Sequence, residues 1–112
     1  RRQRVALARA LLTEAPTLVL IEPTSALDSH TEARVAAQVL RARAGRTTVV
    51  VTASPLVLEA CDEVVLLDSS GTELLRSTHR ELMAMARDGH AQAAGYRAVV
   101  SRAMGEDEEA SC

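Results

Sequence analysis

In the first half of the chain, hydrophobic residues recur at the spacing of a helix, then of a strand, and then of a helix and a strand again. The apolar positions predict two helices, at residues 2–12 and 29–44, each followed by a strand, at residues 17–21 and 47–52. In the first helix the pattern puts Val5, Ala8 and Leu12 on one face, with Leu11 beside it. Both strands are continuously apolar or β-branched, which is typical of strands that are covered on both faces.

Turn and capping residues set the ends of the helices. Ser29 and Glu32 form the pattern of a capping box at the start of the second helix, and Gly45 is expected to end that helix. Thr78 and Glu81 repeat the capping box later in the chain. These signals predict where two of the helices begin and where one of them stops.

The second half of the chain continues with shorter elements. Ser54 followed by Pro55 predicts an N-cap and the first position of a helix that runs to about Ala60. The other expected elements are a strand at 63–68, a turn at 69–71, an antiparallel return at 72–76, and helices at 78–87 and 95–103.

Alternating strands and helices of this length predict an α/β fold with helices packed on a parallel sheet. The runs at 17–21, 47–52 and 63–68 would supply three parallel strands, followed by a C-terminal hairpin and helices. Their apolar character requires cover on both faces, which 112 residues supply poorly. We therefore expect a fragment of a longer protein whose preceding portion adds strands, and a first residue that is Arg instead of Met agrees with this.

Composition excludes several kinds of site. All 13 basic residues are Arg, so the phosphate-binding loop with its lysine, G-x-x-x-x-G-K-[ST], cannot exist in this chain. The net charge of −2 gives no electrostatic footprint for nucleic acid. No apolar stretch approaches the roughly 20 residues of a membrane span. Cys61 and Cys112 form no metal-binding pattern, and no metal site is expected.

The most informative motif is the junction from Glu22 to Asp28, which reads Glu-Pro-Thr-Ser-Ala-Leu-Asp. It follows directly on the apolar run of the first strand. A carboxylate at the carboxyl end of a buried strand, next to the turn-forming Pro23, is how α/β nucleotide enzymes present an acid to a phosphate. Taken alone, Glu22 could simply start a turn, and Asp28 or Ser29 could simply cap the next helix.

Together with its neighbours, this junction resembles the C-terminal part of the nucleotide-binding domain of ABC transporters over roughly residues 1–86. The helix at 2–11 is similar to the one that follows the family's Leu-Ser-Gly-Gly-Gln signature, and Arg1 would stand at the last signature position. In the family, that helix directs its positive end at the γ-phosphate of the ATP held by the partner subunit. The segments at 60–68 and 78–82 also match, and the ending near Tyr96 is typical of exporter-type members.

The resemblance assigns Glu22 to the position of the catalytic Glu and places Ile21 where the family has the Asp that positions Mg²⁺. Ile cannot help to hold a hard cation. With a one-residue shift, Glu22 would be the metal-side acid and no general base would remain. Ala53 stands where the family's His contacts the γ-phosphate, and alanine has no donor. We therefore expect a degenerate catalytic site with Ile21 and Ala53 as the degenerate positions.

The resemblance also implies contacts between subunits. Ser25, Ala26, Leu27 and Asp28 resemble the family's D-loop, which runs along the dimer interface and couples two ATP sites. Together with Arg1 they are the expected nucleotide-binding and dimer-interface residues. The implied partners are a second ABC nucleotide-binding domain and the transmembrane domain of the transporter.

The resemblance further implies a partial P-loop NTPase-like sheet with flanking helices. Residues 1–88 would be the C-terminal part of the nucleotide-binding domain, residues 89–104 a helical extension, and residues 105–112 a disordered acidic tail. The parent would couple ATP binding and hydrolysis to transmembrane export, with ATP and Mg²⁺ as cofactors. The segment, itself expected to be soluble, would lie on the cytoplasmic side of the cell membrane.

Without a phosphate-binding loop, the chain alone is expected neither to bind ATP tightly nor to hydrolyse it. Two alternatives stay open. The parent could be the non-catalytic, degenerate partner in an asymmetric ABC heterodimer, or the chain could be an inactive gene remnant that acts at most as an interaction module.

Overall fold

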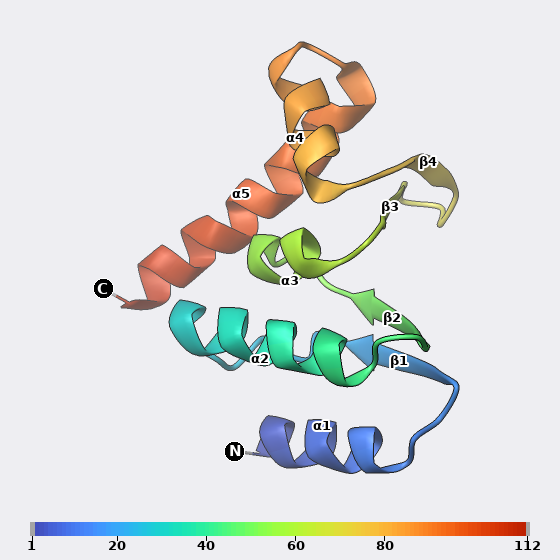
Figure 1. The fold of residues 1–112 in the computed structure, drawn as a ribbon. Coiled ribbons are helices and arrows are strands. Elements are labelled where there is room, and N and C mark those ends of the chain that lie inside the picture. Colours follow the sequence, from blue (N-terminus) through green and yellow to red (C-terminus); the bar gives the residue numbers. More distant parts are fainter. Residues whose placement is uncertain (1, 112) are drawn as a thin grey trace. The chain divides into compact units, whose positions relative to one another are not determined.

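The computed structural model describes residues 2–111, and the side chains of residues 5–103. The chain is mixed α/β, as predicted, and divides into two compact units, one up to Thr52 and one from Ala53 on. Figure 1 shows the elements in order: α1 (Arg2–Leu12), β1 (Thr17–Ile21), α2 (Ser29–Ala42), β2 (Thr47–Val51), α3 (Pro55–Ala60), β3 (Val64–Leu67), β4 (Glu73–Ser77), α4 (His79–Arg87) and α5 (Ala91–Ser111).

The first unit is a two-stranded parallel sheet with both of its helices on one face. β1 and β2 pair in register from Thr17 opposite Thr47 to Ile21 opposite Val51. The core of the unit joins one residue from each of three elements, namely Leu7, Leu20 and Val39. Partly buried side chains pack around this core: Leu11, Leu18, Val35 and Val50. The strand residues in these two lists have even numbers, so a single face of the sheet is covered.

The opposite face of this sheet consists of exposed branched side chains. The exposed fractions are 58% for Val19, 72% for Ile21, 47% for Val49 and 52% for Val51. Within the described residues the two strands are therefore covered on one face only, and the expectation that a preceding portion covers the other face stays a prediction.

The buried face of α1 includes Leu11, as predicted, but is otherwise centred on Leu7 instead of on Val5, Ala8 and Leu12. Leu7 is buried and Leu11 is half-buried, whereas Val5 and Leu12 are 59% and 81% exposed. The helix is rotated so that positions four residues apart, Leu7 and Leu11, meet the sheet.

A buried arginine joins the end of α2 to the segment before β1 and to the start of β2. Arg43 is the C-cap residue of α2, and only 3% of it is exposed. Its guanidinium donates to the carbonyl oxygens of Ala15 at 2.5 Å and Thr47 at 2.8 Å, and its Nε donates to Thr48 Oγ1 at 3.1 Å. α2 thus ends before the expected position, and Gly45 lies in the following turn with φ +82°.

The second unit begins with α3 and an antiparallel hairpin. Ser54 is the N-cap of α3 and Pro55 is its first residue, as predicted. β3 and β4 pair antiparallel, and the turn between them is closed by Asp68, whose Oδ1 accepts from the backbone N–H of Ser70 and of Thr72 at 2.9 Å each. The hairpin confirms the sequence prediction, but β3 forms a separate sheet with β4, so the expected third parallel strand is wrong.

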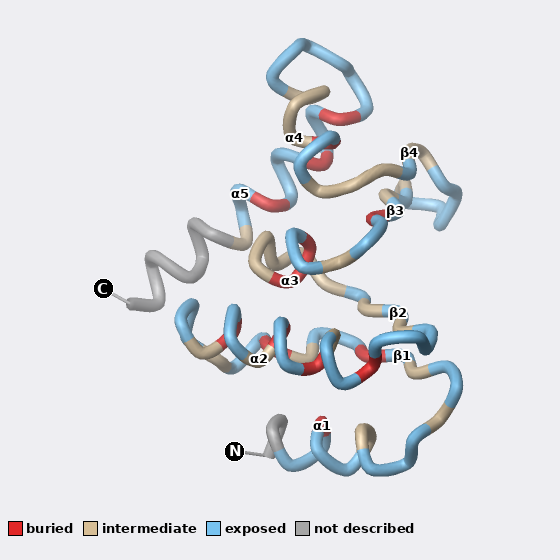
Figure 2. The backbone as a smooth tube through the Cα atoms, in the orientation of Figure 1, coloured by how far each residue is buried: buried red, intermediate tan, exposed pale blue. Residues whose placement is uncertain are grey.

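Helices α4 and α5 complete the core of the second unit. The buried cluster joins α3, β3, α4 and α5 through Leu58, Val64, Leu82, Tyr96 and Val100. Figure 2 shows these buried positions along one side of α5 and in α4. The predicted cap of α4 is confirmed, because Thr78 Oγ1 accepts from the backbone N–H of Glu81 at 3.1 Å.

The C-terminal helix is longer than expected, from Ala91 to Ser111. The disordered acidic tail expected at 105–112 concerns residues whose side chains lie outside the described part, and it stays a prediction. The same holds for the assignment of residues 1–88 to a family domain and of 89–104 to an extension.

Candidate functional site

The predicted catalytic residue, Glu22, lies at the carboxyl end of the parallel strand β1. Its backbone N–H donates to the carbonyl oxygen of Val51 at 2.8 Å, which extends the pairing of β1 with β2 by one residue. The side chain is exposed, and the backbone has φ +48°, in the left-handed region that residues other than glycine adopt at a cost of about 1–2 kcal/mol. The fold therefore presents this carboxylate at a strained turn directly after the strand.

The loop after Glu22 is a compact turn. The Ser25 N–H donates to the carbonyl oxygen of Glu22 at 3.4 Å, and the Leu27 N–H donates to that of Thr24 at 3.0 Å. Ser25 and Ala26 are exposed and Leu27 is half-buried. The expected interface residues thus lie together on one turn, in which Ser25 and Ala26 face outward.

A buried hydrogen bond anchors this turn to the helix behind it. Thr24 and Glu32 are 4% and 6% exposed, and the Thr24 hydroxyl donates to Glu32 Oε2 at 2.5 Å. Glu32 was expected to form a capping box with Ser29, and the structure gives it this different role. No local sequence pattern signals this contact, because the two residues are eight positions apart and belong to a loop and a helix.

Asp28, the last of the expected interface residues, is the N-cap of α2 in place of the predicted Ser29. Its Oδ1 accepts from the Thr31 N–H at 2.9 Å and its Oδ2 accepts from the Thr31 hydroxyl at 3.0 Å. The backbone bond and then the hydroxyl bond lower the pKa of Asp28. The carboxylate is thus ionised and engaged in capping the helix, one of the two roles that the sequence allowed.

The two positions expected to be degenerate differ in their surroundings. Ile21 points to the exposed face of the sheet beside Val51. Ala53 is half-buried and follows β2 by two residues, as the first residue of the second unit. Arg1 lies outside the described residues.

The residues present do not fit a Mg²⁺-ATP site by themselves. Mg²⁺ is held through carboxylates and phosphate oxygens, and the strand end offers the hydrocarbon side chain of Ile21 beside a single carboxylate, Glu22. Asp28 is turned toward its helix cap. In the described part of the chain, no three His, Cys, Asp or Glu side chains gather into a group that could hold a metal ion.

None of the helices in the described part of the chain combines the length and the hydrophobicity that a membrane crossing requires.

Comparison with known proteins places the chain beside one group of transport proteins. No protein-family model matches it. It is 46% identical over 82 residues to the ATP-dependent lipid A-core flippase of Alkalilimnicola ehrlichii, a stretch that covers 73% of this chain. The identity to the flippase of the same name is 43% over 89 residues in Pseudomonas putida and 40% over 109 residues in Pseudomonas aeruginosa, covering 80% and 97% of this chain.

The matched stretch is a small part of each relative, 14% of the first two flippases and 16% of the third. The similarity nevertheless includes most of this chain at an identity of 40% or more. It supports the relationship to ABC exporters that the sequence motifs led us to expect.

Proposed function

We propose that the chain is the C-terminal part of the ATP-binding domain of an ABC exporter, and that its parent couples ATP binding and hydrolysis to transport across a membrane. The observation that carries this proposal is the similarity of most of the chain to flippases that are named ATP-dependent. The cofactors, ATP and Mg²⁺, would be held mainly by elements outside this chain, since its own residues do not form their site.

The geometry of the Glu22 turn supports the proposal. An exposed carboxylate follows directly on a parallel strand, at the edge where α/β proteins bind their ligands. Its left-handed backbone conformation is of the kind that persists at functional sites although it costs stability. The exposed Ser25 and Ala26 would face the partner domain, while Thr24 and Asp28 hold the turn against α2.

A second candidate function keeps the family and changes the role. The apolar Ile21 and Ala53 occupy two positions where the resemblance implies polar catalytic side chains. We propose as the alternative that the parent is the non-catalytic partner of an asymmetric pair, which contributes an interface and leaves hydrolysis to the other domain. The parent would act on the cytoplasmic side of the membrane in both cases.

Reading the coding DNA upstream of Arg1 and assaying the complete product tests both proposals. The first predicts an in-frame phosphate loop with its lysine, and an ATPase of the purified transporter that Glu22→Gln reduces at least about 100-fold, the scale expected for loss of a general base. The matched control is Glu14→Gln, which changes an exposed glutamate that also has a left-handed backbone, φ +52°, before β1.

The outcomes separate the two candidates. Loss of activity in Glu22→Gln with retention in Glu14→Gln supports the catalytic role. Equal activity in both variants, within a pair whose second domain is active, supports the non-catalytic role. A reading frame without a phosphate loop or membrane segments, and without a neighbouring gene that encodes them, contradicts both.

A further inference from the structure

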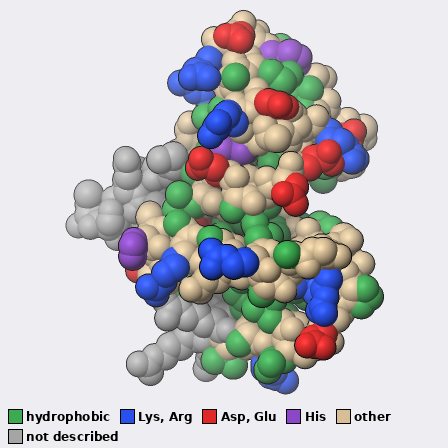
Figure 3. Space-filling model, in the orientation of Figure 1, with side chains coloured by type: hydrophobic (Ala, Val, Ile, Leu, Met, Phe, Trp, Pro, Cys, Tyr) green, Lys and Arg blue, Asp and Glu red, His purple; other side chains and the backbone are tan. Residues whose placement is uncertain are grey.

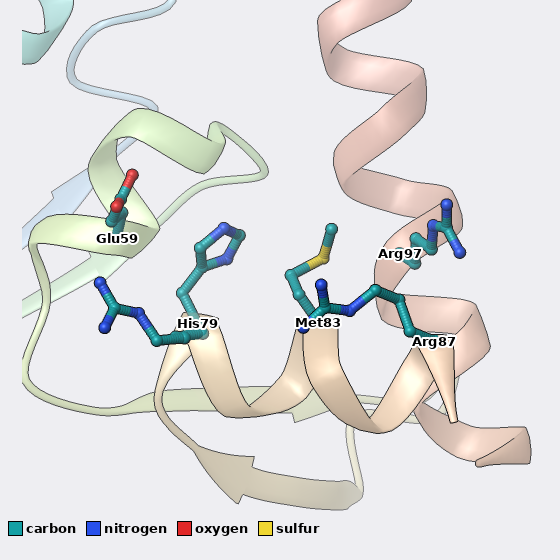
Figure 4. A pocket seen from close by; sticks show the side chains of 6 residues that line it. Glu59, His79, Met83, Arg87 and Arg97 are labelled. Carbon is teal, nitrogen blue, oxygen red and sulfur yellow. The ribbon is translucent and has the colours of Figure 1, made fainter. Parts of the chain in front are cut away.

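Three arginines line a pocket in the second unit. It has a volume of about 240 Å³ and is lined by Glu59, His79, Arg80, Met83, Arg87 and Arg97. α4 contributes four of these side chains, which recur at helical spacing, while α3 and α5 contribute one each. Figure 4 shows Arg87 extending along α4 toward Met83 and Arg97 reaching out from α5, and Figure 3 shows basic side chains on the surface over α4.

The charges of this pocket are not neutralised within the described residues. The ion pairs in that part of the chain all involve Arg76, which does not line the pocket. Glu59 is the one acidic side chain in the lining, so Arg80, Arg87 and Arg97 leave it with a net charge of +2. Like charges gathered on one surface repel one another, and a bound anion relieves that repulsion.

The imidazole ring of His79 is held in place by Tyr96. Its Nδ1 lies 2.5 Å from the hydroxyl oxygen of Tyr96, and the two rings meet edge to face at 5.7 Å. Tyr96 is only 3% exposed, and burial raises its pKa to about 12, so the phenol stays protonated. When this hydroxyl donates to Nδ1, the other ring nitrogen, Nε2, carries the hydrogen and can donate to a ligand.

We propose that this pocket binds the phosphate group of a phosphate monoester. A phosphate monoester carries a charge of about −1.5 to −2 at neutral pH, which matches the net charge of the lining. The planar guanidinium group binds phosphate oxygens in pairs, and this makes arginine the favoured residue for such recognition. The volume lies below the roughly 300–1,000 Å³ of pockets for drug-sized ligands, so it suits a small head group. This site does not depend on the proposed exporter function.

Binding is measured on the complete 112-residue chain by NMR at pH 7.5 and constant ionic strength with chloride. The free probe is glycerol 3-phosphate, and the membrane probe is a phosphatidylcholine vesicle that contains phosphatidic acid, compared with one that contains phosphatidylglycerol. Arg97→Gln should weaken binding at least about tenfold, which corresponds to about 1.4 kcal/mol. Its matched control, Arg102→Gln, removes the same charge from an exposed position on α5 outside the pocket and should change binding less than about twofold.

Both arginines are exposed, so circular dichroism should show the same helix content in both variants. Saturable binding of glycerol 3-phosphate that depends on Arg97 supports a soluble ester as the ligand. Selective binding to phosphatidic acid vesicles that depends on Arg97, without binding of the free ester, supports a lipid head group. No saturable binding of either probe, or equal weakening by both substitutions, overturns the proposal.

Discussion

The buried hydrogen bond from Thr24 to Glu32 should hold the Glu22 turn in place. Thr24→Val keeps the shape of the side chain and removes the only donor that the structure shows for the Glu32 carboxylate among the described residues. Both partners are almost fully buried, so the carboxylate loses its partner without gaining much water. A buried polar group left unsatisfied costs about 1–3 kcal/mol, and a charged group costs more. We therefore expect Thr24→Val to lower the free energy of unfolding by at least about 2 kcal/mol.

The assay is urea unfolding, monitored by far-ultraviolet circular dichroism. The control is Thr17→Val, which replaces an exposed threonine of β1 and should change the free energy of unfolding by less than about 0.5 kcal/mol. Adding Glu32→Leu to Thr24→Val should recover part of the loss, because the carboxylate is then gone as well. The hydrogen bond does not hold the turn if Thr24→Val lowers the free energy of unfolding no more than Thr17→Val does. The same conclusion follows if the double variant lowers it by the sum of the two single effects.

Three further substitutions test the fold around the site by the same urea assay. Arg43→Met should lower the free energy of unfolding by about 3 kcal/mol or more, because each hydrogen bond from a charged group contributes about 1.5–3 kcal/mol. If it lowers stability no more than Arg41→Met, at an exposed position of α2, the hydrogen bonds of the buried Arg43 do not stabilise the fold. Ile21→Ser should change stability by less than about 0.5 kcal/mol, whereas Leu20→Ala should cost about 2–5 kcal/mol; equal losses would mean that both faces of the sheet are covered. Burial raises the pKa of Tyr96 from 10.0 to about 12, so folding favours the neutral phenol. The stability that this preference adds to the folded state is complete below about pH 10 and is lost as the pH rises toward about 12. Between these pH values the free energy of unfolding should fall by at most about 1.4 kcal/mol per pH unit. Tyr96→Phe should reduce this pH dependence, and an unchanged pH dependence would show that Tyr96 does not cause it.

The sequence predicted the helices and strands well where the signal is local. Apolar spacing located β1 and β2, Pro55 marked the first residue of α3, and Thr78 marked the cap of α4. Each of these signals depends on residues within one or two turns of chain. The hairpin around Gly71 was predictable for the same reason.

Contacts between distant segments could not be predicted in this way. A continuously apolar strand carries no alternation, so the sequence did not show that Leu20 is covered while Ile21 is exposed. Arg43 has the pattern of a solvated residue in a last helical turn, but its guanidinium reaches the carbonyl oxygen of Ala15, 28 positions earlier. Asp28 and Ser29 are equally good caps by residue type, and the geometry of the turn selected Asp28.

The candidate site was predictable only in outline. The family motif located Glu22 and the turn that follows it, and the structure shows Glu22 at the end of a parallel strand. The side chains that fix that turn, Thr24 and Glu32, interact through tertiary packing and left no mark in the sequence. The arginine pocket was missed because its side chains come from three helices that are separated along the chain.

The incomplete catalytic site is tested most directly by measuring phosphate release from ATP by the purified 112-residue chain in the presence of Mg²⁺. We expect a rate equal to that of buffer, and the same rate for Glu22→Gln. The chain has no lysine for a phosphate loop, and the residue beside its one strand-end acid is the apolar Ile21. Magnesium-dependent hydrolysis that is lost in Glu22→Gln and kept in Glu14→Gln would contradict this expectation, since the chain would then contain a complete catalytic site.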